Sequence, residues 1–118
     1  MTSKPSKVIS HLLPLIAFLF IANVGKGAEV EAWTKETFTK AGQGDAREQY
    51  NLGLMYDTGQ GILKDTVNAY AWCNVASANG SKVASKNRDL IAKEMTPEQI
   101  AEAQKLSKVW FEKYQPKD

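Results

Sequence analysis

The sequence predicts an all-α fold: an α/α superhelical solenoid of about two helix-turn-helix repeats plus capping helices. Three observations lead to this prediction. Apolar residues recur at helical spacing through most of residues 29–114. Residues that suit N-caps stand directly before several of these segments, and glycines mark the turns between them.

Residues 44–80 predict helix, turn and helix. Asp45 suits an N-cap because its carboxylate can accept from the unpaired N–H groups of a first helical turn. Gly59 and Gly61 can adopt the positive φ angles that end a helix, and Asp65 can cap the next one. The expected apolar positions are Ala46, Tyr50, Leu52, Leu54, Met55 and Tyr56 in the first helix and Ala69, Trp72, Cys73 and Ala76 in the second.

This stretch resembles a Sel-one-like repeat, a tetratricopeptide-related α/α unit. The family pattern combines a Gly-Asp start, a Gln, a Leu-Gly pair, a Tyr, a Gly-x-Gly turn, a Lys-Asp pair and a closing Ala, Trp, Ala and Gly. The matching residues are Gly44, Asp45, Gln49, Leu52, Gly53, Tyr56, Gly59, Gly61, Lys64, Asp65, Ala69, Trp72, Ala76 and Gly80. At position 48 the family usually has a small residue, whereas this chain has Glu48. The charge predicts that the neighbouring surface is more exposed to solvent. The resemblance implies a right-handed superhelical stack.

Residues 28–43 are predicted to form an N-terminal capping helix that covers the open side of the repeat. Val30, Trp33, Phe38 and Ala41 have approximate helical spacing. Trp33 could be a ligand platform, but core or capping duty is expected because aromatic side chains dominate burial in small domains.

Residues 81–118 are predicted to form a degenerate second repeat with a C-terminal capping helix. The Asn79-Gly80 start repeats the Gln43-Gly44 start at an offset of 36 residues. Thr96 is expected to be the N-cap of the last helix, in a capping box with Gln99. The expected apolar positions are Val83, Leu90 and Ile91 in the first of these helices and Ile100, Ala103, Leu106, Val109 and Trp110 in the second.

Gly53 is predicted to lie where two helices cross closely. Small residues at Ala69, Ala71, Ala76 and Ala78 would allow the close approach of neighbouring helices.

Residues 1–27 have the three-part layout of a secretory signal peptide. Lys4 and Lys7 precede an apolar run, and small residues follow it. Cleavage is expected after Gly27, with Ala28 as the alternative. An uncleaved membrane anchor is the competing interpretation, but the run from Val8 to Val24 is short for spanning a bilayer. The mature chain is therefore expected to be periplasmic or secreted.

The charge distribution argues against nucleic-acid binding. The chain has 15 basic and 13 acidic residues. Three of the basic residues lie in the first 28, which leaves 12 against 13, a net charge of −1. A mature segment with this balance lacks the basic footprint that nucleic acids require.

The sequence predicts no catalytic residues, no cofactor-binding residues and no metal ligands. The single histidine, His11, lies in the predicted signal peptide, which removes His-dependent triads and metal sites. The single cysteine, Cys73, is expected to be a buried apolar side chain, with a redox thiol as the alternative. Asp57 and Asp65 flank the turn, but the segment between them lacks the alternating acids of a calcium loop, and its glycines are interpreted as turn residues. Glu98 and Glu102 are interpreted as a solvated helix face.

The resemblance implies an adaptor or scaffold that binds another protein or peptide and needs no cofactor. Groove or surface positions are suggested at Tyr50, Asn51, Met55 and Tyr70. Two alternatives stay open. One is a secreted hydrolase acting on cell-wall or β-lactam substrates, an activity associated with some secreted members of the resembled family. The other is a structural subunit tethered to a membrane by its apolar N-terminus.

Overall fold

The computed structural model describes residues 27–117, and this part of the chain is all-helical, which confirms the predicted fold class. The helices are α2 (Gly27–Gly42), α3 (Ala46–Thr58), α4 (Thr66–Ala78), α5 (Lys82–Ala92) and α6 (Pro97–Lys113). The predicted signal peptide lies outside the described residues except for Gly27. The chain divides into two compact units, the first ending at Trp33 and the second starting at Thr34.

Side-chain oxygens cap the N-termini of the four later helices. Asp45, Asp65 and Ser81 each accept from the backbone N–H three residues ahead. Thr96 accepts from the Gln99 N–H, while the Gln99 side chain accepts from the Thr96 N–H, so the predicted capping box is present. These contacts satisfy N–H groups that a helix start leaves unpaired, and they explain why each helix begins where it does.

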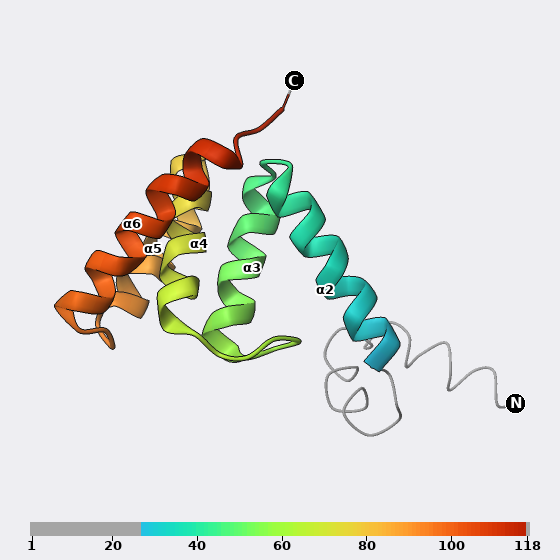
Figure 1. The fold of residues 1–118 in the computed structure, drawn as a ribbon, viewed down its shortest axis with the longest axis horizontal. Helices are drawn as coiled ribbons and strands as arrows, with labels where there is room; N and C mark the ends of the chain where they lie inside the picture. The colour runs from blue at the N-terminus through green and yellow to red at the C-terminus, as the bar shows by residue number, and fades with distance from the viewer. Residues whose placement is uncertain (1–26, 118) are drawn as a thin grey trace, which may run out of the picture. The chain divides into compact units, whose positions relative to one another are not determined.

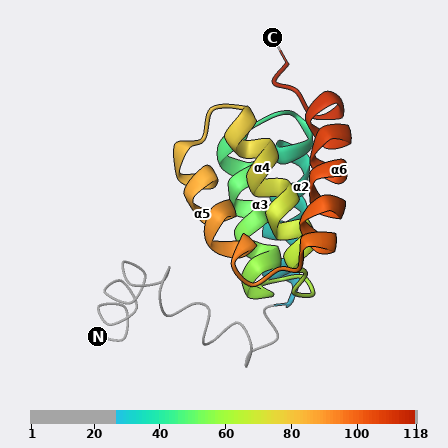
Figure 2. The same ribbon diagram turned by 90° about the vertical axis from the view of Figure 1, so that its left-hand side faces the viewer.

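Helix α4 lies at the centre of the second unit. It packs against α3, α5 and α6, and Figures 1 and 2 show α3 beside it with α5 and α6 on its other flanks. Its sequence explains this position, because the buried residues of α4 include Ala69, Ala71, Cys73, Val75 and Ala76, all fully inaccessible. Small side chains around most of its circumference let three helices approach it at once.

The close crossing predicted at Gly53 is confirmed. A Cβ atom added to Gly53 would lie 2.6 Å from the Cys73 Sγ and 3.2 Å from both the Ala69 carbonyl oxygen and the Cys73 nitrogen. Two of these neighbours are backbone atoms of α4. The helices α3 and α4 can therefore approach this closely only because residue 53 is a glycine.

A buried amide, Gln49, ties three parts of the unit together. Its Nε2 donates to the carbonyl oxygens of Ala41 and Tyr114, both at 3.0 Å. Its Oε1 accepts from the Asn79 Nδ2 at 2.9 Å. Gln49 has no exposed surface, so every polar atom of this side chain is paired inside the protein. The family position occupied by Gln49 is therefore a structural cross-link between α2, the end of α4 and the end of α6.

An aromatic stack reinforces the packing between α4 and α6. The Trp72 ring stacks on Trp110 with centroids 4.6 Å apart, and on Tyr114 at 5.4 Å, each with an interplanar angle of 26°. Such stacking adds to the area that these large rings bury.

Several positions predicted to form apolar stripes are instead exposed. Val83 and Leu90 on α5 are 51% and 56% exposed, and the buried residues of this helix are Ala84 and Ile91. Val109 on α6 is 59% exposed, whereas the buried residues of this helix are Ala103 and Ser107. The other predicted positions were right, since Ile91 and Ala103 are buried and Ile100, Leu106 and Trp110 pack against the core.

The predicted stripe of the first helix is also only partly buried. In α2, Ala41 is buried as expected, but Thr37 is the second buried residue and Phe38 is 38% exposed. Within residues 27–33, Trp33 is 40% exposed, so Trp33 is not a core residue, and its capping role stays a prediction.

Candidate functional site

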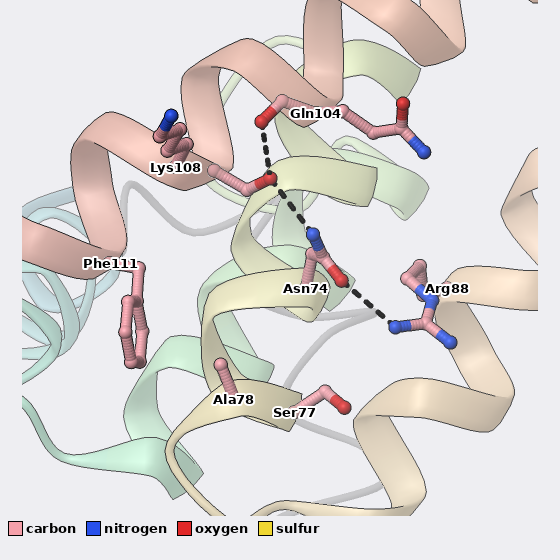
Figure 3. A pocket seen from close by; sticks show the side chains of 8 residues that line it. Asn74, Ser77, Ala78, Arg88, Gln104, Lys108 and Phe111 are labelled. Carbon is pink, nitrogen blue, oxygen red and sulfur yellow. Dashed lines mark hydrogen bonds between the residues drawn. The ribbon is translucent and has the colours of Figure 1, made fainter.

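Three helices enclose an open hollow of about 350 Å³. Helix α4 contributes its floor, while α5 and α6 provide the walls (Figure 3). The lining residues are Asn74, Ser77, Ala78, Arg88, Gln104, Ser107, Lys108 and Phe111. The arrangement follows from the packing of α5 and α6 on different flanks of α4, which leaves a recess between them.

A directional chain of hydrogen bonds crosses the hollow. The Arg88 Nη1 donates to the Asn74 Oδ1 at 2.9 Å, and the Asn74 Nδ2 donates to the Ser107 Oγ at 2.9 Å. The Ser107 hydroxyl then donates to the Gln104 carbonyl oxygen at 3.0 Å (Figure 3). Asn74 thus accepts at one end and donates at the other, which fixes the orientation of its amide. The chain links all three helices and holds the Arg88 guanidinium in place over the floor.

The electrostatic character of the hollow is cationic. Arg88 and Lys108 both line it, and its eight lining residues, all in the described part of the chain, include no acid. Arg88 also forms an ion pair with Asp89, whose Oδ1 lies 3.0 Å from Nη2. The side chain of Asp89 is 70% exposed against 25% for Arg88, so this pair is solvated and screened. Within residues 27–117, Lys108 takes part in no ion pair.

The four groove positions suggested by the sequence do not line this hollow. Met55 and Tyr70 are buried, with 2% and 7% of their surface exposed, and belong to the core. Tyr50 and Asn51 on α3 are half-buried, and the Asn51 Nδ2 donates to the Glu48 Oε1 at 3.3 Å. The prediction that Met55 and Tyr70 lie at the surface was wrong. Helices α3 and α4 are each buried on more than one apolar face, and these two residues lie within the buried part.

The residues of the hollow were missed, although one signal was available. Asn74 interrupts an otherwise apolar run in α4, between Cys73 and Val75. A polar residue in a central helix needs a partner, and Ser107 supplies it from 33 residues away. Neither Arg88 nor Lys108 belongs to a motif, so only the fold brings them together.

Cys73 is a buried thiol with low reactivity. It has no exposed surface and lies under Gly53 in the crossing of α3 and α4. Burial raises the pKa of the Cys73 thiol from an ordinary 9.0 to about 12, with Asp57 adding to the shift and Arg88 opposing it. Since the thiolate is the nucleophile, this environment favours the apolar interpretation of Cys73 over a redox role.

We expect the free energy of unfolding to fall as pH rises from about 9 to about 12. In this window the unfolded chain has lost the Cys73 proton while the folded chain retains it, so alkali favours unfolding. Burial also raises the pKa of the Tyr50 and Tyr56 phenols, which adds to the same fall. Urea unfolding at several pH values should therefore show a shallower decline for Cys73→Ala than for the wild type. Equal slopes would contradict the raised pKa of Cys73.

The geometry offers little for catalysis. Ser107 is the buried hydroxyl of the hollow, and it bonds to an amide and a carbonyl, neither of which is a general base. Asp65 accepts from the Asn68 N–H and Nδ2, so this carboxylate serves as a helix cap.

Across residues 27–117, no group of three or more His, Cys, Asp or Glu side chains could hold a metal ion. In the same region, no helix has the length and apolarity needed to cross a membrane.

A solved structure is similar to this chain over most of the chain's length. No protein-family model matches the chain, and no curated protein matches it. The crystal structure of a protective antigen present in uropathogenic Escherichia coli strains, which displays an SLR (Sel-one-like repeat) fold, is 34% identical with a TM-score of 0.67. The match covers 69% of this chain and 18% of the antigen, so this chain spans about a fifth of the length of that protein.

Proposed function

We infer that this chain, which has the Sel-one-like repeat fold, is a non-enzymatic module that binds another protein or peptide. The observation that carries the proposal is the hollow between α4, α5 and α6. It is open to solvent, large enough for several side chains, and lined by polar groups held in place by hydrogen bonds from three helices. Preorganised polar groups on rigid helices lower the entropy cost of binding a partner.

The non-enzymatic part of the proposal is supported by the hydrogen-bond partners in the hollow. A hydrolase acting by a serine nucleophile needs a base within hydrogen-bond reach of the hydroxyl. The Ser107 hydroxyl instead donates to the Gln104 carbonyl oxygen, and the Asn74 amide donates to it. The hydrolase alternative therefore has no structural support at this site.

We also propose that the module acts outside the cytoplasm, after removal of residues 1–27. The support is the sequence pattern of these residues, with lysines followed by an apolar run and small residues. The intact mass of the protein from its native host decides between this proposal and a retained membrane tether. A mass that still includes the first 27 residues would contradict cleavage at Gly27.

Site-specific photocrosslinking in native cells tests the binding function. We would place a photoreactive phenylalanine at Gln104, which lines the hollow, and at the neighbouring Lys105, which does not. Both positions are exposed on α6, so both replacements should leave folding intact. We expect a discrete protein adduct from position 104 and little or none from position 105.

Two results would contradict the proposal. The absence of any protein adduct at either position would argue against an interaction module. An adduct at position 105 alone would leave a binding function but would remove the hollow as its site.

A further inference from the structure

We propose that the hollow recognises an acidic segment of its protein partner, with a partner carboxylate held by Arg88 and Lys108. This inference rests on the proposed binding function and adds the chemical class of the partner. The two cations come from different walls, Arg88 from α5 and Lys108 from α6 (Figure 3). An extended peptide placed between the walls would pass both of them.

Arg88 is prepared for a carboxylate. A guanidinium has five N–H donors, and Nε, Nη1 and Nη2 each make a hydrogen bond within the protein. Two donors are left over, one on each of Nη1 and Nη2. The bond from Nη1 to Asn74 orients the side chain without neutralising it, since an amide oxygen carries no net charge. A guanidinium held in this way loses little further entropy when it binds an anion.

Lys108 supplies a second charge without a competing partner. It is exposed, lines the hollow and forms no ion pair among the described residues. The nearby Phe111 adds a half-buried apolar surface to the same wall. A hollow with two cations, several amide and hydroxyl groups and one aromatic edge complements a peptide in which acidic and apolar residues alternate.

The charge is too small and too local for a polyanion. Nucleic acids and anionic membranes are held by many cations over an extended surface. Here the exposed Asp89 carboxylate lies beside Arg88, so a continuous phosphate surface would meet a repelling charge. One carboxylate side chain, entering from the other side of the guanidinium, avoids it.

Selection from a random peptide library displayed on phage, with the full chain immobilised, tests this inference. We expect the recovered peptides to be enriched in Asp and Glu. Replacing these acids by Asn and Gln in a synthetic copy should weaken binding about tenfold or more, the loss of a charge-assisted hydrogen bond. Arg88→Gln and Lys108→Gln should each weaken the parent peptide similarly and make its binding less sensitive to salt.

Arg47→Gln and Lys105→Gln are the matched controls. Both remove one positive charge from an exposed position outside the hollow, and both should leave affinity nearly unchanged. Circular dichroism checks that each variant is folded. Lys108→Gln keeps the test valid even if Arg88→Gln unfolds, because among residues 27–117 Lys108 takes no part in the hydrogen bonds that join the three helices.

The outcomes separate this inference from the binding function. Peptides without acidic enrichment, or acidic peptides that bind Arg88→Gln and Lys108→Gln as well as the wild type, would overturn the inference while the binding function stands. Binding of phosphatidylglycerol vesicles or DNA, with no peptide recovered, would overturn it in favour of a phosphate surface. If no probe binds, the inference fails, and the crosslinks at position 104 decide the binding function independently.

Discussion

Gly53→Val is expected to destabilise the fold by about 3 kcal/mol, at the upper end of the usual cost of overpacking. The new Cβ would lie 2.6 Å from the Cys73 Sγ and 3.2 Å from two backbone atoms of α4. Sulfur can move only slightly in this closed site, and the α4 backbone cannot move without disturbing its contacts with α5 and α6. Urea unfolding followed by circular dichroism measures the change.

Ala101→Val is the matched control for Gly53→Val. Ala101 is exposed in the second turn of α6, so this variant carries the helix-propensity cost of valine relative to alanine, about half a kcal/mol, without a steric clash. The double variant Gly53→Ala with Cys73→Ala isolates the sulfur contact. Removing Sγ should recover part of the loss caused by Gly53→Ala alone, giving a coupling energy of about 1 kcal/mol. Equal stability of Gly53→Val and the wild type would show that the helices do not cross closely there.

Local rules predicted the helices well. Each N-cap residue needs only its own side chain and the next turn, so Asp45, Asp65 and Thr96 could be identified from the sequence. The Gly59 turn is equally local, with a φ of +76° that favours glycine. These signals do not depend on the neighbouring helices, and they were confirmed.

The inward faces of the outer helices were predicted only in part: Ile91 and Ala103 are buried as expected, but Leu90 and Val109 are not. In α5 the larger Leu90 is 56% exposed while Ala84 is fully buried. Which residues of a helix turn inward depends on the surface they meet, and in α5 that surface takes Ala84 and Ile91. The helical spacing of apolar residues predicts that a helix has an apolar face. The partner helix determines which side chains of that face fit against it.

The hollow was even less accessible to sequence reasoning. Asn74, Arg88 and Ser107 are hydrogen-bonded across separations of 14 and 33 residues, in helices that belong to two different repeats. None of these residues belongs to the repeat pattern. The packing of whole helices determines which polar side chains meet in a helical stack. A short sequence motif therefore does not identify such a site.

The buried Gln49 had a motif, but its role became visible only in the structure. The family position pointed to a glutamine, and the structure shows that its amide reaches Ala41, Asn79 and Tyr114. These partners lie 8, 30 and 65 residues away. One side chain therefore connects the capping helix, the central repeat and the end of the last helix.

Gln49→Met is expected to destabilise the protein by about 3 kcal/mol. Methionine has a similar length and suits a buried site, so the packing change is small. The loss comes from hydrogen bonding, because the Asn79 Nδ2 loses its 2.9 Å acceptor and the Tyr114 carbonyl keeps only a 3.4 Å contact with Asn79. Each buried polar group left without a good partner costs about 1–3 kcal/mol.

The C-terminal end of α6 should be the first part to respond to Gln49→Met. The Tyr114 carbonyl is held by Gln49, while the Tyr114 ring stacks on Trp72, so losing the hydrogen bond should loosen the stack. We expect faster removal by carboxypeptidase of the residues from the C-terminus back to Tyr114, and altered tryptophan fluorescence before global unfolding. Gln43→Met, at an exposed turn position, is the control and should change stability by less than about 0.5 kcal/mol.

A double-mutant cycle distinguishes the hydrogen-bond network from simple packing. Gln49 and Asn79 share a bond, so removing Asn79 by Asn79→Ala should cost less in the Gln49→Met background than in the wild type. Strict additivity of the two changes would mean that the hydrogen bond between Gln49 and Asn79 contributes nothing to stability. Non-additivity together with a released C-terminus would establish that one buried amide fastens the last helix to the repeat before it.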